Sequence, residues 1–263
     1  FENIISLIGN ISNEIANEIN ATVLPINDYN SSYKVNVKAY NLYLKGRHIW
    51  NQNSDKNIAS AIKLLKESIK VDSNFAPSYV TLAEAYITQN KFISDNKEKQ
   101  FNRGKSRIII NKSLELNEDL GMAYITKGNI LGKFDWDWEG MKIMLEKGLQ
   151  IDPNNAYGHM LLSDYYLVNN DLNTAINEAL IAENLDPLNA QIGMMLGDKY
   201  CIVGEYEKSI EQYQKILDVF PNNGSALSEL GFVYFINEQK EQAVNSWIRL
   251  QEIIDCLFQS PNS

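Results

Sequence analysis

The second half of this chain repeats itself at a fixed spacing of 34 residues. Each unit carries a leucine, a small residue directly after it and a tyrosine four positions after the leucine. Self-similarity at a period of roughly 20–50 residues is typical of arrays in which one supersecondary unit stacks on the next. The matched positions are Leu162, Ser163, Tyr166 and Ala175; Leu196, Gly197, Tyr200 and Ser209; and Leu230, Gly231, Tyr234 and Ala243.

The matched positions have physical roles in a pair of packed helices. A small residue after the leucine, as at Ser163, Gly197 and Gly231, lets the first helix of a pair approach the second closely. Pro187 and Pro221 end the second helix, because proline lacks a backbone N–H and restricts the residue before it. Such pairs bury their faces only against neighbours. The period therefore predicts an all-α, right-handed superhelical solenoid of about six helix pairs.

The N-terminal segment follows a different pattern from the repeats. Isoleucines recur every three or four residues from Ile4 to Ile19, which predicts an amphipathic helix, and a polar stretch after it reads as a linker. We therefore divide the chain into an N-terminal helix and linker at 1–34 and an array at 35–263. The approximate repeats of the array are 40–75, 76–120, 121–155, 156–189, 190–223 and 224–258.

Two irregularities interrupt the array, and its end is unusual. A polar insertion of about a dozen residues at 90–103 is expected to form a loop, because insertions in repeat arrays map to loops. The turn Phe134-Asp135-Trp136-Asp137-Trp138 carries one extra residue. The last helix runs on from Lys240, and we expect this C-terminal helix to cap the array or to meet a partner.

Composition and charge exclude several classes of partner. Lys and Arg total 24 against 33 Asp and Glu, a net charge of −9, which would repel a nucleic-acid backbone. The longest apolar runs, such as Ile108 to Ile110, are far shorter than a membrane span of about 20 residues. Cys201 and Cys256 are too far apart for a metal or redox pair, and we expect no cofactor. Because the helical pattern begins at Phe1, we expect an excised portion of a longer protein, from either a cytoplasmic or an extracytoplasmic compartment.

The repeat residues resemble those of tetratricopeptide repeats (TPRs). More specifically, the chain resembles the C-terminal TPR region that follows a TolB-like segment in bacterial signalling proteins. Those proteins begin with a nucleotide cyclase, a winged-helix DNA-binding domain or a kinase. The resemblance implies a sensory or regulatory arm. The motifs that carry it are Ala39-Tyr40-Asn41-Leu42-Tyr43-Leu44-Lys45-Gly46-Arg47, Asp135-Trp136-Asp137-Trp138-Glu139-Gly140, His159 and Leu185-Asp186-Pro187.

The first helices of TPR units line an inner groove, and in this chain that groove would be apolar with acidic points. Methionines suit a surface that adapts to a helix or an extended peptide, and the alternative is that they pack against neighbouring helices or the N-terminal helix. Carboxylates would favour a basic partner. The basic and amide residues that clamp a C-terminal carboxylate in chaperone-binding relatives are missing. The expected partner-binding residues are Glu84, Ile125, Asn129, Met160, Leu161, Asp164, Met194, Met195, Asp198, Glu229 and Phe232.

No residue of the chain indicates catalysis. Trp136 and Trp138 are interpreted as aromatics that hold a turn to the core, and His48 and His159 as structural residues. The leading hypothesis is a non-catalytic module that binds a polypeptide, including another copy of itself. Two alternatives remain open: a regulatory tail of a nucleotide cyclase whose catalytic domain is absent here, and a small-ligand sensor whose groove is closed by the Ile4–Ile19 helix.

Overall fold

Twelve helices and one π-helical segment, without any strand, make up the part of the chain that this computed structural model describes, residues 36–52 and 54–259. The N-terminal helix predicted within residues 1–34 lies outside the described residues. The helices are α2 (Val37–Asn51), α3 (Asp55–Val71), α4 (Ala76–Gln89), α5 (Asn96–Leu116), α6 (Gly121–Ile130), η2 (Leu131–Asp135), α7 (Trp138–Ile151), α8 (Ala156–Val168), α9 (Leu172–Leu185), α10 (Ala190–Ile202), α11 (Tyr206–Val219), α12 (Gly224–Ile236) and α13 (Lys240–Gln259).

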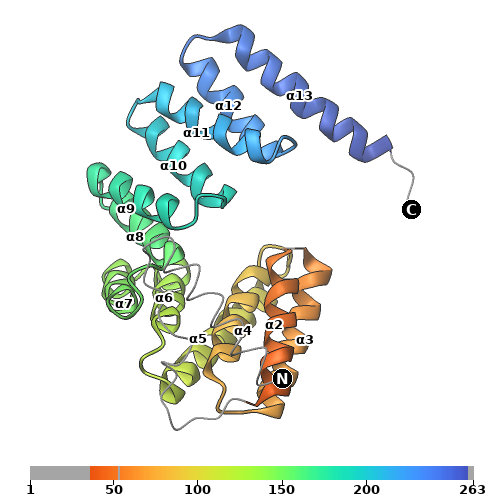
Figure 1. The fold of residues 1–263 in the computed structure, drawn as a ribbon, viewed down its shortest axis with the longest axis vertical. Coiled ribbons are helices and arrows are strands. Elements are labelled where there is room, and N and C mark those ends of the chain that lie inside the picture. Colours follow the sequence, from red (N-terminus) through yellow and green to blue (C-terminus); the bar gives the residue numbers. More distant parts are fainter. Residues whose placement is uncertain (1–35, 53, 260–263) are drawn as a thin grey trace, which may run out of the picture.

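Consecutive helices pair as antiparallel hairpins, and each hairpin packs on the next. Figure 1 shows the pairs following a curved path, with α2 and α3 at one end, α12 and α13 at the other, and α6 to α9 between them. The curve brings the two end pairs to the same side of the middle pairs (Figure 1). The predicted all-α solenoid of stacked helix pairs is confirmed.

Asparagine side chains cap the N-terminus of the first helix in three successive pairs. The carboxamide oxygens of Asn155, Asn189 and Asn223 accept hydrogen bonds of 3.0, 3.1 and 3.0 Å from backbone N–H groups in the first turns of α8, α10 and α12. Each such cap stabilises a helix by about 1 kcal/mol. These asparagines stand one repeat apart, so the sequence period fixes the helix starts as well as the packing faces.

Small side chains hold the two helices of a pair close together, as the sequence predicts. The Ser163 hydroxyl donates to the carbonyl oxygen of Ala175 at 2.6 Å, and the Ser209 hydroxyl donates to that of Gly197 at 2.8 Å. A Cβ at Gly197 would lie 2.9 Å from the ring of Tyr213, closer than carbon atoms normally approach. Neither first helix could carry a larger residue at this position without moving away from its partner.

The polar insertion at 90–103 is largely helical, which corrects the expected loop. α5 already begins at Asn96, so only the residues between Gln89 and Asn96 connect α4 to α5. The Asp95 side chain accepts a 2.8 Å hydrogen bond from the backbone N–H of Glu98, which caps the helix. An Asp followed three positions later by Glu is a capping-box pattern, and this signal explains why the inserted residues lengthen α5.

The extra residue before α7 is absorbed by the π-helical turn η2. Trp136 follows this turn in the left-handed region, at φ 55°, and Asp137 then caps α7 by accepting a 2.9 Å hydrogen bond from the N–H of Gly140. Trp138 packs against the core between α6 and α8, whereas Trp136 is 74% exposed. The interpretation of both tryptophans as core-holding residues is therefore wrong for Trp136.

Candidate functional site

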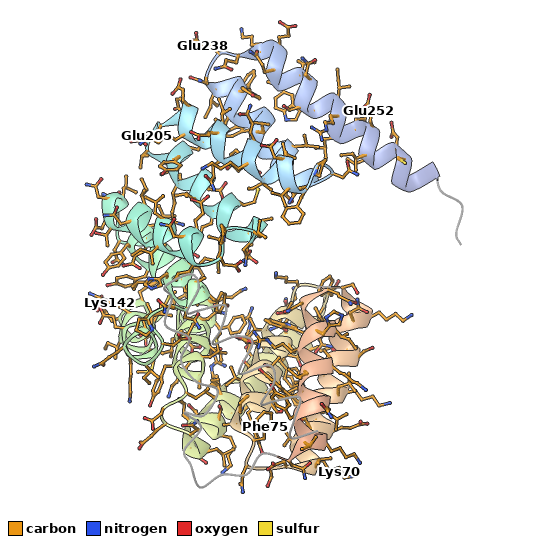
Figure 2. The ribbon with its side chains drawn as sticks, viewed as in Figure 1. Lys70, Phe75, Lys142, Glu205, Glu238 and Glu252 are labelled. Atoms are coloured by element: carbon orange, nitrogen blue, oxygen red, sulfur yellow. The ribbon has the colours of Figure 1, made fainter. Side chains whose placement is uncertain are left out.

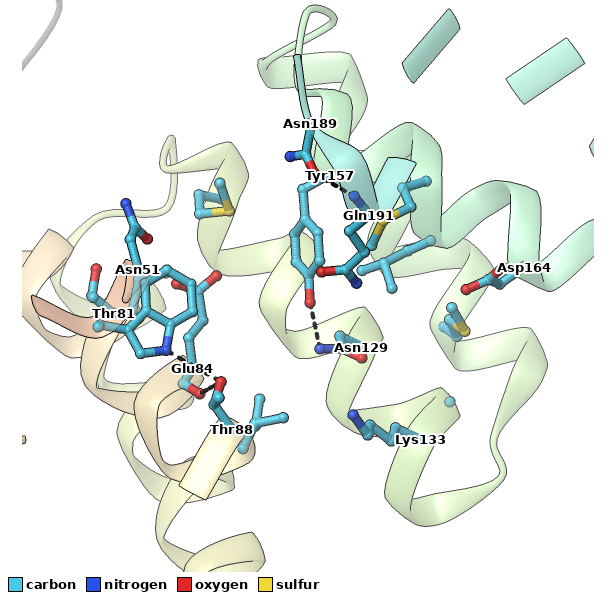
Figure 3. Close-up of a pocket in the computed structure, with 18 of the residues that line it drawn as sticks. Asn51, Thr81, Glu84, Thr88, Asn129, Lys133, Tyr157, Asp164, Asn189 and Gln191 are labelled. Carbon is cyan, nitrogen blue, oxygen red and sulfur yellow. Dashed lines mark hydrogen bonds between the residues drawn. The ribbon is translucent and has the colours of Figure 1, made fainter. Parts of the chain in front are cut away.

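One cavity of about 1030 Å³ crosses the inner face of the array. Its walls come chiefly from the first helices of successive pairs, α2, α4, α6 and α8, with additions from η2, α7 and the start of α10. Figure 3 places Thr81, Glu84 and Thr88 on one side of this groove and Asn129, Tyr157 and Asp164 on the other. The groove therefore exists because the pairs stack along a curve.

A buried carboxyl group lies where α4 meets α6. Glu84 is 8% exposed, and its Oε1 atom accepts a 3.0 Å hydrogen bond from the hydroxyl of Thr126. Burial raises the pKa of Glu84 to about 7, and the Thr126 hydrogen bond and the Arg47 guanidinium oppose this shift. Glu84 is therefore partly protonated near neutral pH, so the groove wall carries less negative charge than the sequence indicates.

A tyrosine and an asparagine join α6 to α8 in the same wall. The side-chain nitrogen of Asn129 donates to the phenol oxygen of Tyr157 at 2.7 Å (Figure 3). Burial, followed by the nearby Glu84 and Asp164 carboxylates, raises the pKa of Tyr157 well above its usual range. Tyr157 is therefore a neutral phenol at any physiological pH.

The third contact along the wall is an ion pair between α8 and α10. The ammonium group of Lys199 lies 3.0 Å from Oδ1 of Asp164, and Lys199 is only 2% exposed. A lysine buried to this degree needs a carboxylate close by, because an unpaired buried charge is strongly destabilising. The Asp164 carboxylate is thus already bound by the protein and contributes little free negative charge to the groove.

Cationic side chains also line the cavity. Arg47, Lys91 and Lys133 all line it, and no carboxylate of the described residues lies within ion-pairing distance of any of them. The pKa of Lys133 is lowered by partial burial and by the positive charge of Lys91, which places the two ammonium groups close enough to repel each other.

The remaining lining is apolar. Met160 and Leu161 of α8 are 6% and 7% exposed and belong to a core cluster that also includes Met141 of α7. Leu167 and Val168 extend this surface toward the end of α8, where Val168 is 54% exposed. A largely apolar floor with a few placed polar groups is the usual composition of a binding cleft.

Of the eleven residues predicted from the sequence, five line the cavity: Glu84, Asn129, Met160, Leu161 and Asp164. The other six do not, and they lie in three settings. Ile125 is fully buried between α6 and α7, where a partner could not reach it. Met194 and Met195 pack against two different core clusters.

The last three predicted residues lie farther toward the C-terminus. Asp198 accepts a 2.5 Å hydrogen bond from the phenol of Tyr213. Glu229 lies near Asp198, and burial followed by that charge raises the pKa of Glu229. Phe232 is 50% exposed on α12. The structure does not bring these three residues to the groove.

Sequence reasoning missed several residues that shape the groove: Trp50, Lys91, Lys133, Tyr157 and Lys199. The Trp50 indole donates to the hydroxyl of Thr88 at 3.2 Å and so ties α2 to α4. Lys91 follows α4 and Lys133 lies in η2, beyond the inner-face positions of the first helices on which the repeat rule operates. A tyrosine or lysine at the inner face one repeat after a polar residue could have indicated the contacts of Tyr157 and Lys199.

Within the described part of the chain, no group of three or more His, Cys, Asp or Glu side chains is arranged to hold a metal ion. Among the described helices, none combines the length and apolar character that crossing a bilayer requires. His159 bridges Glu178 at 2.7 Å and the carbonyl oxygen of Pro153 at 3.0 Å, which is a structural arrangement.

Several solved structures share the arrangement of helices seen in this chain. TTC0263 from Thermus thermophilus, described as a TPR protein, has a TM-score of 0.62 at 13% identity over 75% of this chain and 99% of that one. PilF from Pseudomonas aeruginosa has a TM-score of 0.60 at 14% identity, over 82% and 91%. YrrB, described as a TPR protein with an unusual peptide-binding site, has a TM-score of 0.50 at 18% identity, over 72% and 91%.

The fold is a TPR-type solenoid. At such low identities the likeness shows the arrangement of helices and not a shared ligand. No protein-family model matches the chain, and no curated protein matches it. The resemblance to the TPR regions of TolB-like signalling proteins thus rests on the sequence motifs alone.

Proposed function

We propose that this TPR-type array is a non-catalytic module that binds a polypeptide in the groove of α2, α4, α6 and α8. The observation that carries the proposal is one continuous cavity of about 1030 Å³ shared by the first helices of four successive pairs. A helix about 10 Å wide that rises 1.5 Å per residue would fill such a volume with roughly nine residues. The groove is therefore of a size to hold a short helical or extended segment.

Exposed apolar surface in the groove gives such a segment something to bury. Val168 is 54% exposed and lies beside Met160 and Leu161, which form the floor. Polar side chains fixed by hydrogen bonds, such as Asn129 and Tyr157, stand around this floor and can orient a peptide backbone. Apolar contact with a few fixed polar groups is how helix-in-groove recognition is built.

The test is selection of a displayed random 12-residue peptide library on the intact protein. Enriched peptides are then measured by fluorescence anisotropy on V168R and V168E, which add bulk of opposite charge at a lining position. V219R and V219E are the matched controls, because Val219 is a 50% exposed valine outside the cavity. We expect both Val168 variants to lose binding and both controls to keep it. Equal binding by all four variants, or no enrichment on the wild-type protein, would contradict the proposal.

The signalling context is a further part of this proposal. The motifs shared with TolB-like signalling proteins support a regulatory arm of a bacterial protein, or a tail that regulates a nucleotide cyclase. Reading the gene upstream of the codon for Phe1 tests both at once. A cyclase, kinase or winged-helix domain there would support the regulatory arm, and an unrelated domain would count against it.

The small-ligand alternative is supported by the same cavity, whose volume of about 1030 Å³ is at the upper end of small-molecule pockets. A thermal-shift screen against metabolites tests this alternative. A compound that raises the unfolding temperature of the wild-type protein but not of V168R or V168E would favour a small ligand. A screen without any such compound would weaken it.

Self-association is supported by a separate apolar stripe on α13. Val244, Trp247 and Ile248 are 51%, 39% and 52% exposed, and they share one face of the last helix. Terminal repeats normally carry a polar outer face. We expect V244E/I248E to lower the molar mass in light scattering toward 30.0 kDa, whereas I143E, at a 57% exposed position on α7, leaves it unchanged. A wild-type chain that is monomeric at all concentrations would exclude self-association.

A further inference from the structure

The groove contains both acidic and basic side chains, and each carboxylate that lines it is bound by another side chain of the protein. Glu84 accepts from Thr126 at 3.0 Å, and Asp164 accepts from Lys199 at 3.0 Å. Asp186, at the α9–α10 connection, accepts a 2.9 Å hydrogen bond from the side chain of Asn189. Each carboxylate that lines the cavity therefore already has a partner in the wall.

Two lysines of the groove differ from these carboxylates. Within residues 36–52 and 54–259, neither Lys91 nor Lys133 makes a side-chain hydrogen bond, an ion pair or a cation–π contact. Lys91 follows the end of α4, and Lys133 lies in η2 after α6, so each comes from the segment that joins the two helices of its pair. Both nonetheless line the same cavity.

Repulsion between these two ammonium groups is unusual in a chain of net charge −9. Partial burial, followed by the positive charge of Lys91, lowers the pKa of Lys133, which indicates that the two ammonium groups repel each other. A carboxylate between the two groups would remove this repulsion and could accept a charge-assisted hydrogen bond from each. Among the residues that the structure describes, none supplies such a carboxylate to Lys91 or Lys133.

We propose that Lys91 and Lys133 form a cationic, anion-binding subsite that takes an aspartate or glutamate side chain of the bound polypeptide. The apolar residues of the same ligand would lie on the floor formed by Met160 and Leu161. This inference rests on the proposed polypeptide-binding function and specifies its ligand as an acidic, amphipathic segment. An acidic ligand replaces the basic partner expected from the sequence, because the groove carboxylates that suggested a basic partner already accept hydrogen bonds from side chains of the protein.

The experiment uses the same displayed 12-residue library on the intact wild-type protein and on K91E/K133E. The matched control is K63E/K70E, which makes the same change in net charge at exposed lysines of α3 outside the groove. Figure 2 shows Lys70 at the outer edge of the array. Peptides selected on the wild-type protein should be enriched in Asp and Glu beside apolar residues. The pool from K91E/K133E should shift to Lys and Arg, and the pool from K63E/K70E should match the wild type.

A single peptide then gives the affinity change. Its dissociation constant should rise roughly ten- to hundredfold on K91E/K133E, because a hydrogen bond to a charged group contributes about 1.5–3 kcal/mol. Replacing its critical acidic residue by lysine should restore binding to K91E/K133E and abolish binding to the wild type. Pools of the same composition on all three proteins would overturn this inference while leaving polypeptide binding intact. Failure to enrich any peptide on the wild type would overturn the proposed function as well.

Discussion

Two glycine-to-alanine substitutions should change the stability of the array in opposite directions. Gly148→Ala should destabilise it because α6 and α7 approach closely there, and Gly104→Ala on α5 should stabilise it. A Cβ at Gly148 would lie 2.6 Å from Cγ1 of Ile125 and 2.9 Å from the carbonyl oxygen of Gly121. Ile125 is fully buried and cannot move aside. At Gly104 of α5, by contrast, a Cβ would meet nothing within 4 Å. The two positions therefore differ in surroundings while both lie within helices.

The magnitudes follow from two opposing effects. Alanine is favoured over glycine in a helix by about 0.5–1 kcal/mol, so Gly104→Ala should stabilise the protein by that amount. Gly148→Ala gains no more than this and loses about 1–3 kcal/mol to overpacking, so it should be destabilising overall. Since 1 kcal/mol corresponds to about 2–4 °C in a protein of this size, the two variants should unfold on opposite sides of the wild type.

Thermal unfolding followed by circular dichroism measures this difference. The comparison between the two variants matters more than either shift, because the helix-propensity contribution is largely common to both. If Gly148→Ala were as stable as Gly104→Ala, the backbones of α6 and α7 would not approach as closely as the structure places them. The groove contacts of α6 would then also be in question, since Asn129 lies on that helix.

Two further predictions concern the groove wall. Because the folded-state pKa of Glu84 is about 7 against an ordinary value of 4.5, the folded protein retains a proton that the unfolded chain releases, and wild-type stability should fall as the pH rises through this range. Glu84→Gln removes this effect. In denaturant unfolding, the free energy of unfolding of the variant relative to that of the wild type should therefore rise by on the order of 3 kcal/mol between about pH 4.5 and about pH 8. A gap that does not change with pH would contradict the burial of an ionisable carboxyl. Asp164→Ala leaves Lys199 buried without its carboxylate and should cost about 1–3 kcal/mol in the same assay, less than a fully buried pair because the Asp164 side chain is 45% exposed. The double variant Asp164→Ala/Lys199→Met should recover most of that loss, and a double variant no more stable than Asp164→Ala would show that the ion pair is not the cause.

The fold was predictable from the sequence because packing constraints repeat with the helices. Ser163 and Gly197 stand 34 residues apart, and both lie where one helix of a pair packs closely on the other. Because the same requirement for a small residue recurs in each pair, it appears in the sequence as a period. The helical character of α5 was missed because its first turns are polar. The signal there was the cap at Asp95 and not a buried face.

The groove was only partly predictable. The repeat pattern assigns the same inner-face positions to every helix pair, but in the curved array only some of those positions line the cavity. Inner-face positions of α4, α6 and α8 converge on one cavity, so predicted residues such as Asn129 and Met160 line it. The same positions in α10 and α12, including Met194 and Phe232, lie outside that cavity. The charge of the site was also hidden from the sequence, since pairing between repeats neutralises Asp164 while leaving Lys91 unpaired within the described residues.

Several residues that line this groove also join one helix pair to the next. Glu84 contacts Thr126 across α4 and α6, Asn129 contacts Tyr157 across α6 and α8, and the next contact joins α8 to α10. A ligand that bridges several first helices must therefore stabilise the stacking of the pairs by an amount set by its affinity. Conversely, a change in stacking at any one of these contacts reshapes the site. Ligand binding and the curvature of the array are thus linked, which is what a regulatory arm would require.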